Sequence, residues 1–464
     1  MALTYDDAKR LLDRHEQGDV LKFWGRLTGP ERAALLAQVE TLDFDSIARM
    51  RTMLQKHRVV APAFDPATEP APVIAPSAAE LSDASLEGAA ALQAGKVAVI
   101  LVAGGQGSRL GFEGPKGVYP VGPVTGASLF EIHARKVLRL EQRYGAQVPF
   151  YIMTSEANDA PTQAFFADHG QFGLDPDRVK FFVQGVWPAL SADGRIILDA
   201  PGHIFMSPDG HGGTLSALRR TGMLADMERR GIETVFYFQV DNPLVEVADA
   251  AFVGLHRRAG ADISIKVCAK RDASEGLGVV VAQGGRCAIV EYSDLPQDQK
   301  EARLADGRLK YLYGSVAIHI LSRDFLAQEA AAALPLHVAY KKVPTCNDAG
   351  ETLTPAAPNA YKFEKFIFDI IPDARQALNV AFAREDEFSP LKNASGADSP
   401  ETVRRDLCRK YGRWLAACGV RVPLDGDGTP TVKIEVDPAY ASSADDLRLR
   451  LPKGFAIAGD VLLK

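Results

Sequence analysis

The sequence holds few cysteines, and none of them belongs to a recognisable ligand pattern. Five cysteines are spread along 464 residues, with no CxxC pair and no cluster with histidine. This spacing gives neither a zinc site nor a disulfide framework. Scattered cysteines are typical of proteins in a reducing compartment, so we expect a cytoplasmic localisation.

Long apolar runs and an excess of positive charge are also missing. No apolar stretch reaches the ~20 residues needed to span a bilayer, and the first residues show no apolar signal core. The 53 Lys and Arg residues stand against 59 Asp and Glu, for a formal net charge of −6. We therefore expect no membrane partner and no general nucleic-acid partner, because the latter needs a basic face. An anionic ligand must be held by a local basic cluster.

What is present is a composition typical of globular proteins, with 47% hydrophobic and 24% charged residues. The length suggests about three domains. Residues 4–57 have helical patterns, and the proline-rich stretch that follows cannot be helical. We predict a helical N-terminal region with a linker at 1–88, a catalytic domain at 89–384 and a C-terminal domain at 385–464.

From residue 96 onward, short β-branched runs alternate with helical patterns. The strand candidates are 97–102, 149–154, 179–184, 234–240, 262–269, 277–282, 287–292 and 315–320. The helix candidates are 128–144, 158–169, 214–230 and, before a β-rich tail, 400–417. This alternation predicts βαβ units and an α/β fold with a mostly parallel sheet covered on both faces.

The strongest motif is LVAGGQGSRLGFEGPKG, directly after the first predicted strand. Gly104, Gly105 and Gly107 allow the backbone to approach a phosphate and to direct N–H groups at it. Arg109 and Lys116 add two cations to the same loop. The spacing matches neither the GxGxxG dinucleotide fingerprint nor the Walker A loop, which argues against a nicotinamide-dependent oxidoreductase. We predict a phosphate-binding loop.

A carboxylate follows the predicted strand at 234–240. Asp241 lies at the carboxyl end of this strand, where open α/β sheets bind ligands. The Mg²⁺ that accompanies a nucleotide is usually held by one or two carboxylates and by phosphate oxygens. Asp241 is therefore a candidate metal ligand, and the alternative is an aspartate that only initiates the turn before Pro243.

Three more candidates lie further along the chain. The segment SPDGHGGTLSAL opens a predicted helix with glycines, so its backbone can meet a ligand. Its His211 either contacts substrate or only tolerates the backbone of the helix start. Lys362, in NAYKFEKFIFDII, and Lys392, in EDEFSPLKNA, are the other two. Taken singly, a lysine is usually only a solvated side chain.

Together these segments resemble the eukaryotic-type UDP-N-acetylglucosamine pyrophosphorylases, within the wider group of UDP-glucose and UDP-sugar pyrophosphorylases. The family loop AGGxGTRLG…PKG is present with Ser108 in place of threonine. Collinear stretches include FFVQGVWPAL, QVDNPLVEVADAAFVG and REDEFSPLKNA, and the similarity runs from about residue 97 to 395. The resemblance implies a Rossmann-like three-layer nucleotide-sugar transferase core, with a helical N-terminal region and a small β-containing C-terminal domain.

The resemblance also implies an enzyme, a uridylyltransferase that makes UDP-sugar and pyrophosphate from UTP and a sugar 1-phosphate, with Mg²⁺. The nucleotide would be cradled by Gly104, Gly105 and Gly107, with its uracil contacted by Gln184 and Gly210. The family pattern further assigns Arg109 and Lys116 to the phosphates that leave as pyrophosphate, and Asp241 to Mg²⁺.

For the sugar phosphate, the resemblance implies that Gly278 and Glu291 face the sugar hydroxyls. Lys362 and Lys392 would neutralise the phosphate. Whether Asp369 is a second metal ligand or a structural acid stays open, and we favour the structural interpretation. The oligomeric state is not predicted.

Two departures from the family pattern fall on residues expected near the hexose. The third motif reads Gly-His-Gly-Gly where the family has GNGG, so His211 replaces an asparagine. Ser315 replaces a second sugar-facing asparagine. The phosphate-handling residues are intact, so our hypothesis is that uridylyl transfer is retained and the sugar pocket has changed. Glucose 1-phosphate, galactose 1-phosphate or a broad range are therefore alternatives beside N-acetylglucosamine 1-phosphate, which the family resemblance makes the first candidate substrate. A UDP-sugar-binding protein without catalysis is the alternative from another class.

Overall fold

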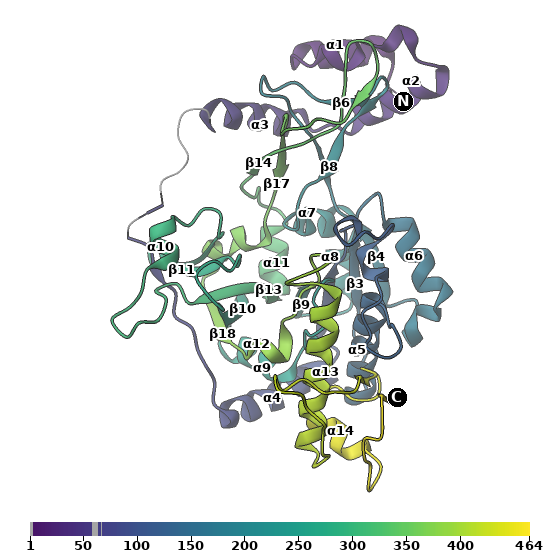
Figure 1. Ribbon diagram of the computed structural model, residues 1–464. Coiled ribbons are helices and arrows are strands. Elements are labelled where there is room, and N and C mark those ends of the chain that lie inside the picture. Colours follow the sequence, from purple (N-terminus) through teal and green to yellow (C-terminus); the bar gives the residue numbers. More distant parts are fainter. Residues whose placement is uncertain (1–2, 58–63, 66) are drawn as a thin grey trace. The chain divides into compact units, whose positions relative to one another are not determined.

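The computed structural model describes residues 3–57, 64, 65 and 67–464, and the chain divides into two compact units (Figure 1). Unit 1 holds the described residues up to 57 together with Gln184–Thr214 and Ala333–Asp369. Unit 2 holds the described residues of Phe64–Val183, together with Leu215–Ala332 and Ile370–Lys464. The boundaries predicted at residues 88 and 384 do not coincide with these units. The assignment of residues 89–384 as the catalytic domain, between an N-terminal region and a C-terminal domain, stays a prediction.

Unit 1 packs the N-terminal helices on short strands from the middle of the chain. Its helices are α1 (Tyr5–Arg14), α2 (Gly29–Thr41) and α3 (Phe44–His57). Its strands are β5 (Val186–Pro188), β6 (Leu198–Ala200), β7 (His203–Ile204), β8 (Met206–Pro208), β14 (His337–Lys341), β15 (Thr345–Cys346), β16 (Thr352–Leu353) and β17 (Ala360–Glu364). These pair as β5–β8, β6–β7, β14–β17 and β15–β16. Leu12, Leu35 and Ile47 from the helices share one core with Leu190 and Phe363.

The described part of unit 2 is built on a ten-stranded sheet. Its strands are β1 (Glu69–Pro70), β2 (Val97–Val102), β3 (Phe150–Thr154), β4 (Val179–Val183), β9 (Thr234–Gln239), β10 (Ile263–Ala269), β11 (Val279–Gln283), β12 (Arg286–Val290), β13 (Tyr313–Ser322) and β18 (Ala377–Ala381). The main order is β1-β11-β13-β9-β2-β3-β4, with β10 beside β13 and β18. Strands β9, β2, β3 and β4 are parallel, whereas β13 runs antiparallel to β9. The predicted α/β class is confirmed.

The helices of this part of the chain include those predicted at 128–144, 158–169 and 400–417. They are α4 (Ala78–Gln93), α5 (Leu129–Tyr144), α6 (Asp159–Asp168), α7 (Gly213–Arg220), α8 (Met223–Arg229), α9 (Ala250–Arg258), α10 (Gln297–Glu301), α11 (Arg323–Glu329), α12 (Arg384–Glu387), α13 (Pro400–Ala417) and α14 (Ala444–Arg450). The prediction of a single helix over 214–230 is wrong, because Gly222 takes a left-handed φ of 78° between α7 and α8. The tail contains one parallel pair, β19 (Ile434–Val436) with β20 (Val461–Leu463). Among the described helices, none is long and apolar enough to cross a membrane.

Helix α4 crosses α9, and the two backbones are in close contact. This helix was not predicted, because it follows directly on the proline-rich stretch. Ser77 caps α4 by accepting a hydrogen bond from the backbone N–H of Glu80. A Cβ atom at Gly88 would lie 1.8 Å from the carbonyl oxygen of Ala250, and one at Gly254 would lie 1.8 Å from that of Ala84. Each helix therefore needs glycine at the crossing point.

We predict that Gly88→Ala destabilises the protein although alanine favours a helix. The added methyl meets backbone that no rotamer change can move, at a cost of about 3 kcal/mol, and helix propensity offsets about 1 kcal/mol. Urea unfolding should show a net loss of about 2 kcal/mol. Gly426→Ala is the matched control, because no atom lies within 4 Å of its Cβ position. Equal stabilities of the two variants would contradict this packing.

Candidate functional site

Two parallel strands of unit 2 end side by side and place the glycine-rich loop next to Asp241. Val102 is the register partner of Gln239 in the β2–β9 pair. The backbone N–H of Val240 then donates to the carbonyl oxygen of Val102 at 3.0 Å. Because β2 and β9 both end at this edge of the sheet, loop 103–117 and Asp241 begin beside each other.

Hydrogen bonds within the glycine-rich loop join its two limbs. The N–H of Gly107 donates to the carbonyl oxygen of Gly114 at 2.9 Å, and that of Lys116 donates to Gly105 at 3.1 Å. A Cβ atom at Gly107 would lie 2.8 Å from the Phe112 ring, whereas one at Gly105 would meet no atom within 4 Å. Gly107 is therefore needed by the loop itself, and Gly105 leaves space beside the backbone for a ligand.

A buried asparagine that the sequence reasoning missed supports the start of this loop. The side-chain amide of Asn158 donates to the carbonyl oxygens of Ala103 at 2.9 Å and of Gly105 at 3.3 Å. Asn158 is fully buried at the start of α6. The sequence pattern did not indicate this supporting role, because an asparagine directly before a helix is already explained as a helix cap.

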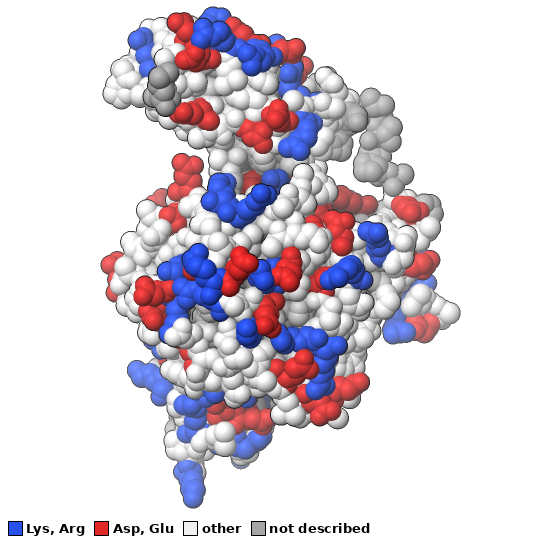
Figure 2. All heavy atoms as spheres, turned by 180° about the vertical axis from the view of Figure 1, so that it is seen from behind, with Lys and Arg blue, Asp and Glu red and all other residues white. Residues whose placement is uncertain are grey.

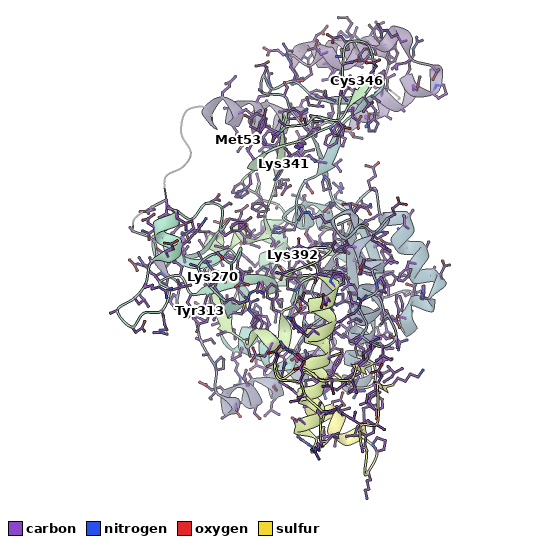
Figure 3. All side chains as sticks on the ribbon, viewed as in Figure 1. Met53, Lys270, Tyr313, Lys341, Cys346 and Lys392 are labelled. Carbon is purple, nitrogen blue, oxygen red and sulfur yellow. The ribbon has the colours of Figure 1, made fainter. Side chains whose placement is uncertain are left out.

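Lys116, Asp241 and the segment that carries Lys392 come together at this edge. The Nζ of Lys116 lies 3.8 Å from Oδ2 of Asp241 and 3.4 Å from the carbonyl oxygen of Leu391. The N–H of Leu391 donates to the carbonyl oxygen of Asp241 at 2.7 Å. Lys392, labelled in Figure 3, is the next residue. Lys116, Asp241 and the backbone that leads to Lys392, from distant parts of the sequence, therefore share one region of unit 2.

Arg109 lies on the same loop, on the turn Ser108–Leu110, where Arg109 is exposed and Leu110 is buried. The described residues contain no group of three His, Cys, Asp or Glu side chains that could hold a metal ion. Asp241 supplies a carboxylate, a group that Mg²⁺ can take as a ligand together with phosphate oxygens and water, and its role as a metal ligand stays a prediction.

Three residues predicted to face the sugar lie together in unit 2. The N–H of Ser315 donates to the carbonyl oxygen of Gly278 at 2.8 Å. A Cβ atom at Gly278 would lie 3.4 Å from Oε1 of Glu291. A shift in the β10–β13 register accompanies this group, and Ala317 there takes a left-handed φ of 58°. Such bulges redirect side chains next to active sites.

The remaining predicted residues, Gln184, Gly210, His211 and Lys362, belong to unit 1. Gly210 has a φ of 82°, and a Cβ atom there would lie 2.5 Å from the carbonyl oxygen of Lys365. Gln184 is buried. Burial lowers the pKa of Lys362, whose Nζ lies 4.8 Å from the centroid of the Phe205 ring. Their contacts with substrate stay predictions.

His211 is held by internal contacts of unit 1. Its Nδ1 accepts a hydrogen bond from the N–H of Ile367 at 3.1 Å, and its ring stacks on Phe366. Burial lowers the pKa of His211 to about 4, so the ring is neutral at pH 7 with its proton on Nε2. A contact between His211 and the sugar stays a prediction, and Nε2–H is the group that would make it.

Asp369 has a structural role in the same unit. Its Oδ2 lies 2.9 Å from Nε2 of His337 and accepts a hydrogen bond from the N–H of Phe366 at 3.3 Å. These two contacts fix the turn that follows β17. They support the structural interpretation of this acid.

A glycine-rich loop and a carboxylate at the carboxyl edge of parallel strands are typical of nucleotide-binding α/β enzymes. The family model described as UTP–glucose-1-phosphate uridylyltransferase matches residues 50–404. The chain belongs to this family and is an enzyme of the uridylyltransferase class.

Relatives named for N-acetylated sugars match nearly the whole chain. The UDP-N-acetylhexosamine pyrophosphorylase-like protein 1 of Homo sapiens is 37% identical, over 96% of this chain and 94% of its own length. The UDP-N-acetylglucosamine pyrophosphorylase of Saccharomyces cerevisiae is 33% identical, over 99% of this chain and 100% of its own. The crystal structure of the Trypanosoma brucei UDP-N-acetylglucosamine pyrophosphorylase is similar with a TM-score of 0.82, 27% identity and coverage of 99% and 98%.

We predict that Lys116→Met lowers kcat by a factor of about 10²–10³, as expected when one positioned electrostatic donor is lost. Initial rates of pyrophosphate release measure this effect. Lys96→Met is the matched control, because Lys96 lies at the other end of β2 and pairs with Glu233 at 3.1 Å. The role given to Lys116 would be wrong if both variants lost less than about tenfold.

Proposed function

We propose that this enzyme transfers the uridylyl group of UTP to N-acetylglucosamine 1-phosphate or a closely related N-acetylhexosamine 1-phosphate. The products are the UDP-sugar and pyrophosphate. The observation that carries the proposal is the meeting of Lys116, Asp241 and the Leu391–Lys392 segment beside a glycine-rich loop. The names of the full-length relatives support the choice of sugar.

The reaction needs alignment more than it needs a protein nucleophile. An oxygen of the sugar phosphate attacks the α-phosphorus of UTP in line, the bond to the β-phosphate oxygen breaks, and pyrophosphate leaves. Both reactants are anions, so cations must offset their repulsion and stabilise the charge that moves to the leaving group. Arg109 and Lys116 would hold the leaving phosphates, and Lys392 would neutralise the sugar phosphate.

Asp241 would hold the Mg²⁺ ion together with phosphate oxygens of UTP. When bound, the ion supplies positive charge that offsets the charge on these oxygens. The unit 1 residues Gln184, Gly210 and Lys362 keep the roles that the resemblance implies. All five cysteines are free thiols, which agrees with a reducing compartment, and we place the reaction in the cytoplasm.

The sugar is tested by a panel of N-acetylglucosamine, glucose and galactose 1-phosphates with UTP. We expect the N-acetylated sugar to have the highest kcat/KM, by about tenfold or more, because a hydrogen-bonding pocket discriminates strongly. Pyrophosphate release is the measurement. Equal or faster use of glucose or galactose 1-phosphate would show that His211 and Ser315 mark an altered pocket. Tight binding of UDP-sugar without turnover would contradict the proposed enzyme.

A further inference from the structure

An asparagine next to Asp241 binds the segment that leads to Lys392. Asn242 is 3% exposed. Its side-chain N–H donates to the carbonyl oxygen of Glu387 at 2.7 Å, and its Oδ1 accepts a hydrogen bond from the N–H of Ser389 at 3.1 Å. The side-chain amide of Asn242 therefore binds two residues of the same segment, which lie five and three residues before Lys392.

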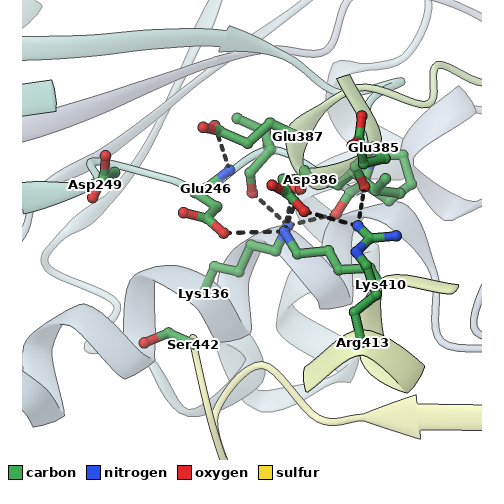
Figure 4. Close-up of polar contacts among 12 residues, drawn as sticks. Lys136, Glu246, Asp249, Glu385, Asp386, Glu387, Lys410, Arg413 and Ser442 are labelled. Carbon is green, nitrogen blue, oxygen red and sulfur yellow. Dashed lines mark hydrogen bonds and ion pairs between the residues drawn. The ribbon is translucent and has the colours of Figure 1, made fainter. Parts of the chain in front are cut away.

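The side chain of Glu387 anchors the same segment to the sheet. Its carboxylate forms an ion pair with Nζ of Lys266, and their side chains are 8% and 4% exposed. Lys266 lies within β10. Oε2 of Glu387 also accepts a hydrogen bond from the N–H of Glu246 at 3.2 Å, a contact visible in Figure 4. Residues 242–246 and 387–389 are thus joined by both backbone and side-chain groups.

Helix α13 contributes a third connection between these segments. Nζ of Lys410 donates to the carbonyl oxygens of Leu244 at 3.0 Å and Asp386 at 2.6 Å, and lies 3.3 Å from Oε1 of Glu246 (Figure 4). Each of its three N–H groups has a partner on one of the two segments. The position of the 386–389 backbone is therefore fixed from the sheet, from the turn after β9 and from α13.

A buried network of this kind is a costly way to gain stability alone. Removing charges from water costs free energy that pairing often only just repays, so well-packed apolar residues serve stability as well or better. Here the polar groups converge on the two segments that carry Asp241 and Lys392. The arrangement therefore serves the relative position of these two residues.

We propose that Asn242 is a positioning residue, which holds Lys392 in register with Asp241 and Lys116. This inference rests on the proposed function, in which Lys392 neutralises the sugar phosphate. Asn242 itself touches no substrate in this account. Its effect on the reaction passes through the Glu387–Leu391 backbone, whose last residue donates to Asp241 and accepts from Lys116.

A double-mutant cycle tests the proposal. Asn242→Ala should lower kcat/KM for the sugar phosphate about 10–100-fold, as is typical for partners that orient functional groups. In a Lys392→Ala background the same change should cost less than about threefold, because the residue through which it acts is already lost. If the two losses multiply, Asn242 does not act through Lys392 and the proposal is overturned.

Asn379→Ala is the matched control, since Asn379 is 4% exposed and its amide donates to the carbonyl oxygen of Pro72 at 3.0 Å. It should keep kcat/KM within about threefold of the parent, and an equal loss would mean that any buried amide has this effect. Glu387→Gln replaces Asn242→Ala if the latter fails to fold. It should show the same non-additivity with Lys392→Ala, and additive losses would again overturn the proposal.

Hydrogen exchange separates this inference from the proposed function. Without substrate, Asn242→Ala should speed exchange at the amides of Ser389 and Leu391 and leave the β2 and β9 amides unchanged. Unchanged exchange at Ser389 and Leu391 would contradict the positioning role even in an active enzyme. If no sugar phosphate is turned over, the proposed function fails while this measurement still reports on Asn242.

Discussion

The parallel pairing of β2 with β9 is the constraint on which the site depends. Both strands are buried along nearly their whole length, so a slip by one residue would exchange their side chains between the two packed faces of the sheet and disrupt the packing on both. The register therefore fixes where each strand stops. The glycine-rich loop and Asp241 follow at the same edge, and the Leu391 backbone then binds to Asp241 and Lys116. The packing of β2 against β9 thus determines where the glycine-rich loop, Asp241 and Lys116 lie.

The protein is acidic overall, and its cations act locally. On the face shown in Figure 2, basic and acidic side chains are interspersed without a continuous basic surface. Lys116 and Asp241 are 19% and 14% exposed in their side chains. Partial burial removes water that would screen their charges, so a few cations can act strongly on phosphates. Net charge is therefore a poor guide to an anion site in a protein of this kind.

The sequence predicted the local features well. Most strands of the sheet, the helix at 400–417 and the loop at 101–117 follow from periodicity and glycine spacing, which are local signals. Helix α4 was missed because the prolines before it dominated the pattern. The split after α7 depended on the backbone of Gly222, and the division into two units joins segments that are far apart in the chain.

The hydrogen bonds that hold the site residues in place were harder to predict, because they also join segments that are far apart in the chain. Asn242 and Glu387 are 145 residues apart, and no local pattern links them. His211 is a similar case, because its Nδ1 is occupied by the backbone of Ile367, from a distant segment. The motifs identified groups that could bind phosphate, whereas the hydrogen bonds that hold those groups appear only in the folded chain.

In the proposed reaction, the site aligns two anions for a single displacement at the α-phosphorus. The configuration at this phosphorus reports the number of displacements. UTP carrying a chiral α-thiophosphate would be converted with the purified enzyme, and the configuration of the UDP-sugar product would be determined by phosphorus NMR. We expect inversion, because one in-line attack inverts the configuration. Retention would show two displacements through a covalent uridylyl-enzyme and would contradict the proposed direct transfer.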